Sequence, residues 1–69
     1  MNISARNVFP GTVKSITAGA VNNEVEIEIA PGVVIVSVIT KGSVETLGLK
    51  VGSKAFAVVK ASSVLIATE

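Results

Sequence analysis

The chain has 69 residues, of which 49% are hydrophobic and 16% charged, and it carries a net charge of +1 with no cysteine or histidine. This length allows one domain, residues 1–69, and the lack of cysteine excludes disulfides and thiolate metal sites. No clustered basic stripe or stacking surface argues for nucleic acid as a partner. The chain has no segment long enough to span a membrane and does not begin like a signal peptide, so we expect a cytoplasmic protein.

The apolar content is high for so small a protein. A domain of this size buries only about 60% of the surface that its unfolded chain exposes. The mean hydropathy is +0.71, so one small core cannot hide all the apolar side chains. We therefore expect the surplus to lie between subunits of an obligate homo-oligomer.

The first half of the chain has the pattern of two strands. Residues 7–16 predict the first, interrupted at Phe9-Pro10-Gly11, where the proline indicates a strand edge or a bulge because it cannot donate to a strand ladder. Residues 21–29 predict the second, in which glutamates alternate with aliphatic residues from Glu24 to Ile29. This alternation indicates a solvated face rather than a cation site, since hard cations usually take their ligands from a tight loop or several segments.

The middle of the chain predicts a third strand and a short helix. Residues 33–40 are apolar on both faces, so we expect one face to be covered by another subunit. Residues 43–49 predict one or two helical turns, with Ser43 as the N-cap and Gly48 in the left-handed position at the helix end.

The last part of the chain predicts two more strands, at residues 54–59 and 64–67. Five strands with a helix between the third and the fourth is the element order of an OB-like barrel. The expected fold is therefore all-β, a small OB-like five-stranded barrel with one short helix, assembled as an oligomer.

Two cationic residues near opposite ends of the chain share unusual surroundings. Arg6 is the only arginine, and both Arg6 and Lys60 have small hydroxyl, amide or methyl side chains as sequence neighbours, with no carboxylate close by. A guanidinium fork and an ammonium group among hydroxyl and N–H donors suit a small tetrahedral oxyanion. For either residue alone, an ordinary surface charge at a strand end is the competing interpretation.

Several short motifs follow one another in a distinctive order and spacing. They are Ser4-Ala5-Arg6-Asn7, Ile39-Thr40 with Ser43-Val44, Leu47-Gly48-Leu49, Gly52 and Val59-Lys60-Ala61-Ser62. In this order they resemble the molbindin family, also called Mop or TOBE-domain proteins, which bind molybdate. The resemblance covers essentially the whole chain, and its most specific element is the first motif.

The resemblance implies a homohexamer, a trimer of dimers, that holds molybdate or tungstate between subunits for molybdenum storage or homeostasis. One subunit is expected to contribute one group of residues to the oxyanion site and its neighbour Thr40 and Ser43. No residue specifies a pterin. The first group consists of Ser4, Ala5, Arg6, Lys60, Ala61 and Ser62.

Two other functions compete with oxyanion binding. An enzyme lacks the usual general bases, because the chain has no histidine, cysteine or aspartate. A dyad of Lys60 with Ser62 or Ser63 requires a lysine that has lost its charge, which a bound anion would oppose. The other alternative is an OB-like module that binds nucleic acid or protein without an oxyanion. We expect no enzyme activity.

Overall fold

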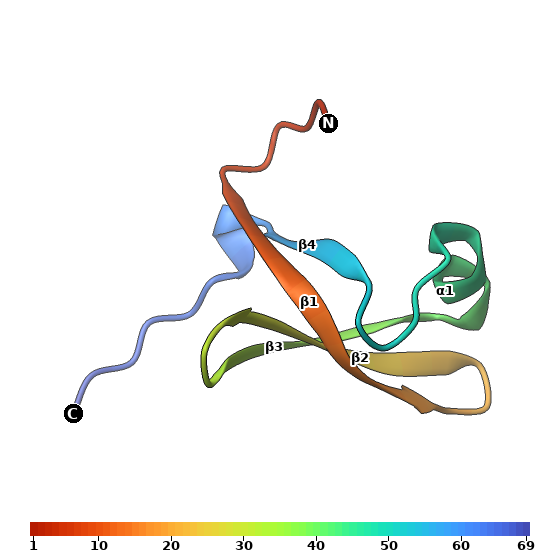
Figure 1. The fold of residues 1–69 in the computed structure, drawn as a ribbon. Coiled ribbons are helices and arrows are strands. Elements are labelled where there is room, and N and C mark those ends of the chain that lie inside the picture. Colours follow the sequence, from red (N-terminus) through yellow and green to blue (C-terminus); the bar gives the residue numbers. More distant parts are fainter.

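The fold is a strongly curled, four-stranded antiparallel sheet that forms half of a barrel (Figure 1). The computed structural model describes residues 1–69. The strand order is β3-β2-β1-β4, so β3 and β4 are the two outer strands. The elements are β1 (Asn7–Ala18), β2 (Asn22–Ala30), β3 (Val33–Thr40), helix α1 (Lys41–Leu47), β4 (Lys54–Val59) and a single 3₁₀ turn, η1 (Ala61–Ser63).

The hydrophobic core lies on the inner face of the curled sheet and is very small. Only six of the 69 residues are buried, and five of these are the apolar residues of the core. Helix α1 covers one end of this face through Val44, its only buried residue. The five core residues are Val13, Val25, Ile27, Val44 and Ala57.

The outer face carries the glutamates of β2, as their alternation predicts. Val25 and Ile27 are buried, whereas Glu24, Glu26 and Glu28 are exposed or half-buried. The Ser15 hydroxyl donates a 2.7 Å hydrogen bond to Glu26 Oε1 across the β1–β2 pair. No group of three acidic, histidine or cysteine residues is placed to hold a metal ion. The three glutamates of β2 therefore form a polar face of the sheet.

The predicted interruption of the first strand at Pro10 is wrong, because β1 runs without a break from Asn7 to Ala18. Its pairing with β2 begins only at Thr12, so at Pro10 the only neighbouring strand is β4. The missing N–H therefore removes no bond to β2. The irregularity comes later, between Val13 and Ser15, where the register with β2 shifts.

Helix α1 begins two residues earlier than the sequence pattern predicts, and Thr40 rather than Ser43 is its N-cap. Thr40 has extended backbone angles, and its Oγ1 accepts a 3.0 Å hydrogen bond from the Ser43 N–H. The strand end already holds Thr40 in the conformation that an N-cap needs, so the helix starts there. Gly48 does close the helix in the left-handed region, at φ 63°.

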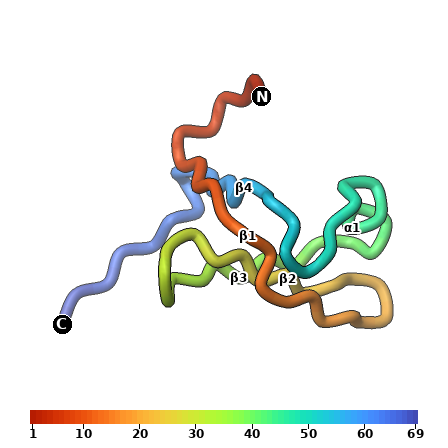
Figure 2. The backbone as a smooth tube through the Cα atoms, viewed as in Figure 1, coloured from red at the N-terminus to blue at the C-terminus, as the bar shows by residue number.

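The predicted fifth strand at residues 64–67 is wrong for the single chain. After η1 the chain has no regular structure, and residues 64–69 extend away from the sheet (Figures 1 and 2). A strand needs a partner, and no other strand of this chain lies beside this segment. The fold is therefore a half-barrel of four strands, not a five-stranded barrel.

No helix has the length and apolar character that crossing a membrane requires.

Candidate functional site

The pairing of β1 with β4 brings Arg6 and Lys60 together. Asn7 and Val59 are register partners at the end of this antiparallel pair. Arg6 precedes Asn7 and Lys60 follows Val59, so the two cationic residues leave the sheet at the same end. Residues that are far apart in the sequence thus flank one surface.

A surface hollow of about 480 Å³ lies at this end of the sheet. We call it the cationic hollow. All six residues that were expected from one subunit line it, and none of its lining residues is acidic. The lining residues are Ile3, Ser4, Ala5, Arg6, Lys60, Ala61 and Ser62.

The donors of the cationic hollow are not used inside the chain. No side-chain hydrogen bond in the structure involves Arg6, Lys60 or the hydroxyls of Ser4 and Ser62. At η1 the Ser63 N–H donates to the Lys60 carbonyl over 2.9 Å, which shapes the turn. The first N–H groups of such a turn have no intrahelical acceptor. Two positive charges and several neutral donors therefore face solvent without a protein acceptor.

Thr40 and Ser43 do not line the cationic hollow. Thr40 pairs with Asn22, at the start of β2, which lies beside the far end of β1 because Asn23 pairs with Ala18. The two hydroxyls contact each other, since Thr40 Oγ1 donates to Ser43 Oγ over 2.9 Å. One chain therefore holds the two expected parts of the site at opposite ends of its longest strand.

Sequence reasoning missed one residue of the cationic hollow. Ile3 lines it and is about half exposed. A single aliphatic residue before the first strand carries no signal for a polar site, and only the folded arrangement places it there. Ile3 supplies an apolar wall next to the donors.

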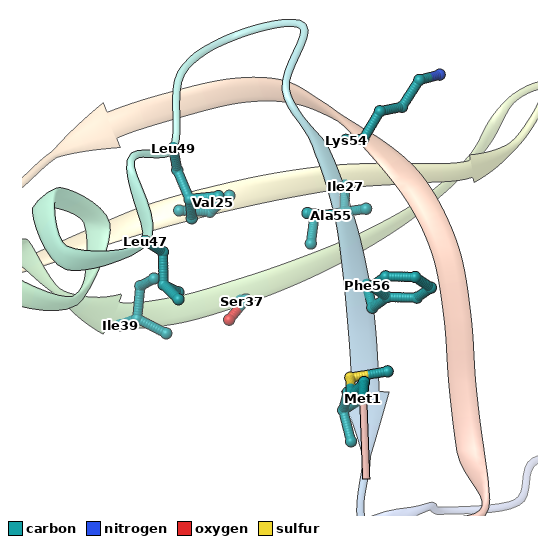
Figure 3. Close-up of a pocket in the computed structure, with 11 residues that line it drawn as sticks. Met1, Val25, Ile27, Ser37, Ile39, Leu47, Leu49, Lys54, Ala55 and Phe56 are labelled. Carbon is teal, nitrogen blue, oxygen red and sulfur yellow. The ribbon is translucent and has the colours of Figure 1, made fainter. Parts of the chain in front are cut away.

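A second concavity, of about 370 Å³, has a different character (Figure 3). We call it the apolar groove. It lies on the inner face of the sheet, with Ile39 of β3 on one side, Phe56 of β4 on the other and Leu47 of α1 at its end. Nine of its 11 lining residues are hydrophobic, so it offers too few donors for an oxyanion.

Comparison with known proteins gives the family. The model of the TOBE domain matches residues 3–66, which is nearly the whole chain. The chain belongs to the TOBE domain family. The resemblance seen in the sequence motifs is thereby confirmed.

Two curated relatives of this TOBE domain differ in length. A probable molybdenum-pterin-binding protein from Haemophilus influenzae is 45% identical over 69 residues, which cover both chains completely. The molybdenum transport protein ModE from Azotobacter vinelandii is 46% identical over 69 residues, but the TOBE domain described here spans only 26% of that protein.

Two solved structures share the fold. MopII from Clostridium pasteurianum superposes with a TM-score of 0.90 at 46% identity, covering 97% of this TOBE domain and all of that chain. The cytoplasmic molybdate-binding protein ModG, with molybdate bound, superposes with a TM-score of 0.84 at 51% identity, covering 88% of this TOBE domain and 43% of ModG. The curled half-barrel is therefore an arrangement that molybdate-binding proteins also have.

Proposed function

We propose that this protein binds molybdate, and that the cationic hollow is its main contact with the anion. The observation that carries the proposal is the convergence of Arg6 and Lys60 in a hollow without an acidic residue. A tetrahedral dianion is costly to remove from water unless charges and donors meet its oxygens. The guanidinium fork can hold two oxygens, and the ammonium and hydroxyl groups can hold the others.

The site is completed by a neighbouring copy, which contributes Thr40 and Ser43. Support comes from their position, because one chain keeps these two hydroxyls away from its own cationic hollow. Thr40 is exposed at the end of β3, and Ser43 is half-buried in the first turn of α1, so a second chain can reach this part of the surface. The site is then a shared one, and anion binding is coupled to assembly.

The surface of the isolated chain supports self-association. A folded monomer of this mass is expected to expose about 4,000 Å², whereas this chain exposes 5254 Å². The exposed side chains include many large apolar ones, such as Val36, Val38 and Phe56. Covering them requires other copies, and we propose the homohexamer, a trimer of dimers, that the family resemblance implies.

The proposed biological role is storage or homeostasis of molybdenum in the cytoplasm. Tungstate, which is also a tetrahedral dianion, is a second ligand. Hydrogen phosphate should bind poorly because its proton needs an acceptor, and the cationic hollow has no carboxylate. No group beyond the oxyanion is required, so a pterin is not part of the proposal.

Neither alternative function gains support from the site. A hydrolase would need an activated nucleophile, but the hydroxyls of Ser62 and Ser63 have no hydrogen bond to the Lys60 ammonium group or to any other side chain. A binding module for single-stranded nucleic acid would need a basic groove with aromatic residues, whereas the groove that contains Phe56 is apolar. We therefore propose a binding protein without catalysis.

Calorimetric titration tests the function directly. Molybdate, tungstate and sulfate are titrated into the wild type, Arg6→Ala and Lys14→Ala, with light scattering to measure the assembled mass. Loss of a partner from a desolvated charge pair costs about 2–5 kcal/mol, so Arg6→Ala should weaken molybdate binding by about thirtyfold or more. Lys14 is an exposed cation outside the cationic hollow, so Lys14→Ala is the matched control. Equal affinity of Arg6→Ala and the wild type would refute the site.

A further inference from the structure

The donors of the cationic hollow do not by themselves distinguish one tetrahedral dianion from another. Its side chains offer a guanidinium group, an ammonium group and hydroxyls, all of which donate to any anion oxygen that lies before them. Molybdate, tungstate and sulfate carry the same charge, and all three only accept hydrogen bonds. They differ in size and in hydration, because sulfate is the smallest and holds its water most tightly. Selectivity against sulfate therefore requires a part of the hollow that responds to size or to hydration.

Ile3 is the one lining side chain that meets this requirement. Four of the seven lining residues carry a side-chain donor, and two are alanines, whose side chain is a single methyl group. Ile3 alone has a large apolar side chain, which can neither donate to an oxygen nor hold a water molecule. It is 51% exposed, so it is part of the surface of the hollow and not of the core. Branching at Cβ keeps this side chain stiff, which makes it a fixed apolar wall.

The position of Ile3 also affects the donors that follow it. Residues 1–6 form an arm that precedes β1 (Figure 1). None of the nine backbone hydrogen bonds outside the helices and strands involves this arm. The hollow is lined only by residues 3–6 of the arm and by residues 60–62. Side-chain packing therefore sets the distance between these two sides, and Ser4 and Arg6 stand on the same arm as Ile3.

We infer that Ile3 is the residue that makes the cationic hollow select molybdate and tungstate over sulfate. The inference rests on the proposed function and names the side chain that governs the choice of anion. Anion oxygens that face the isoleucine lose their water without gaining a hydrogen bond. This loss costs a strongly hydrated ion more than a weakly hydrated one, so it counts most against sulfate.

The size of the anion acts in the same direction. A larger anion fills the space between the apolar wall and the donors on the other side of the hollow. A smaller anion cannot touch both sides, so it leaves either a donor or the wall without a contact. Shortening Ile3 to alanine opens room for water, and this water restores the hydrogen bonds that sulfate otherwise lacks.

Calorimetry on variants of Ile3 tests the inference. Molybdate is titrated into the wild type and Ile3→Ala, alone and in the presence of excess sulfate, which gives both dissociation constants by displacement. The selectivity is the dissociation constant for sulfate divided by that for molybdate. Ile3→Ala should lower this ratio by about tenfold or more, since one methylene at the wall of a binding pocket is worth at least such a factor.

A second pair of variants separates polarity from shape. Ile3→Val and Ile3→Thr have nearly the same shape, but only Ile3→Thr adds a hydroxyl that can hold a water molecule or donate to sulfate. Ile3→Val should keep most of the wild-type ratio, and Ile3→Thr should lower it. This comparison also keeps the test decisive if Ile3→Ala does not assemble, because equal ratios in the two variants would then overturn the inference.

Val33→Ala is the matched control. Val33 is 48% exposed, close to the value for Ile3, and lines neither the cationic hollow nor the apolar groove. Its truncation should leave the ratio of the two dissociation constants unchanged. Urea unfolding and light scattering establish that each variant keeps the fold and the assembled mass of the wild type.

Equal ratios in the wild type, Ile3→Ala and Ile3→Thr would overturn the inference, even if all affinities fell together. A common fall would mean that Ile3 only holds the arm in place. A wild type that binds sulfate as tightly as molybdate would overturn it at the outset. Failure of the proposed function is a different result, because the wild type would then show no heat of binding with molybdate at all.

Discussion

Two cationic side chains meet at one hollow because a single register pair, Asn7 with Val59, ends β1 and β4 together. The close approach of β1 to β2 limits the size of the residue at position 11. A Cβ added at Gly11 would lie 2.7 Å from the Glu28 carbonyl oxygen and 2.7 Å from Ile27 Cγ2. Real Cβ atoms do not come so close to backbone, so Gly11 lets β1 cross closely over β2.

We predict that Gly11→Ala destabilises the protein. Overpacking of this kind costs about 1–3 kcal/mol. Gly42→Ala is the matched control, because its added Cβ would meet only Thr40 Oγ1, at 3.9 Å, and alanine favours the helix by up to about 1 kcal/mol. Urea unfolding of both variants at equal protein concentration measures the difference. Equal stability of Gly11→Ala and the wild type would show that the strands do not cross so closely.

Among the elements, α1 depends on Thr40, the residue that precedes its first turn. Thr40 caps the helix and, in the proposed function, also offers a hydroxyl to the anion of a neighbouring copy. The cap hydrogen bond from the Ser43 N–H joins the two residues. The proposal therefore makes helix stability and anion binding depend on the same oxygen atom.

We predict that Thr40→Ala lowers both stability and molybdate affinity, whereas Thr40→Ser preserves both. Loss of an N-cap hydroxyl costs about 1 kcal/mol, which unfolding in urea without molybdate measures. Calorimetry on the folded variants separates the second effect. If Thr40→Ala loses stability but binds molybdate like the wild type, Thr40 is a cap and not a ligand.

The local pattern of polar and apolar residues in the sequence predicted four strands at almost their observed positions, because alternation and apolar runs report directly on burial. It assigned the cap to Ser43 instead of Thr40, since both side chains can accept the bond and the backbone at the end of β3 decides. It also assigned a strand to residues 64–67, because an apolar β-branched segment has the same pattern whether its partner is in the same chain or not. The meeting of Arg6 and Lys60 follows from strand pairing, which the sequence alone does not specify.

The whole molecule is an open half-barrel with a surplus of exposed apolar surface. Five apolar side chains form its core, and the two groups of proposed anion donors lie at opposite ends of β1. Anything that binds only the assembled form shifts the equilibrium away from free chains by mass action. The proposed shared site gives molybdate this effect.

We predict that molybdate stabilises the wild type in a manner that depends on protein concentration. At a hundredfold excess over the dissociation constant, the gain is about 2.7 kcal/mol per site. Thermal unfolding at several protein concentrations, with molybdate and with an equal concentration of chloride, measures the shift. Lys14→Ala should respond like the wild type and Arg6→Ala should not. A concentration-independent melting temperature would exclude coupling between assembly and binding.

The minimal core has a consequence for the lifetime of the protein in a cell. A newly made chain that buries only six of its 69 residues has little core to keep it folded, and is therefore easily opened for proteases until it meets other copies. Turnover should therefore fall steeply once synthesis exceeds the level at which copies associate. A cell that is short of molybdate would then degrade its empty carrier, without any dedicated signal for degradation.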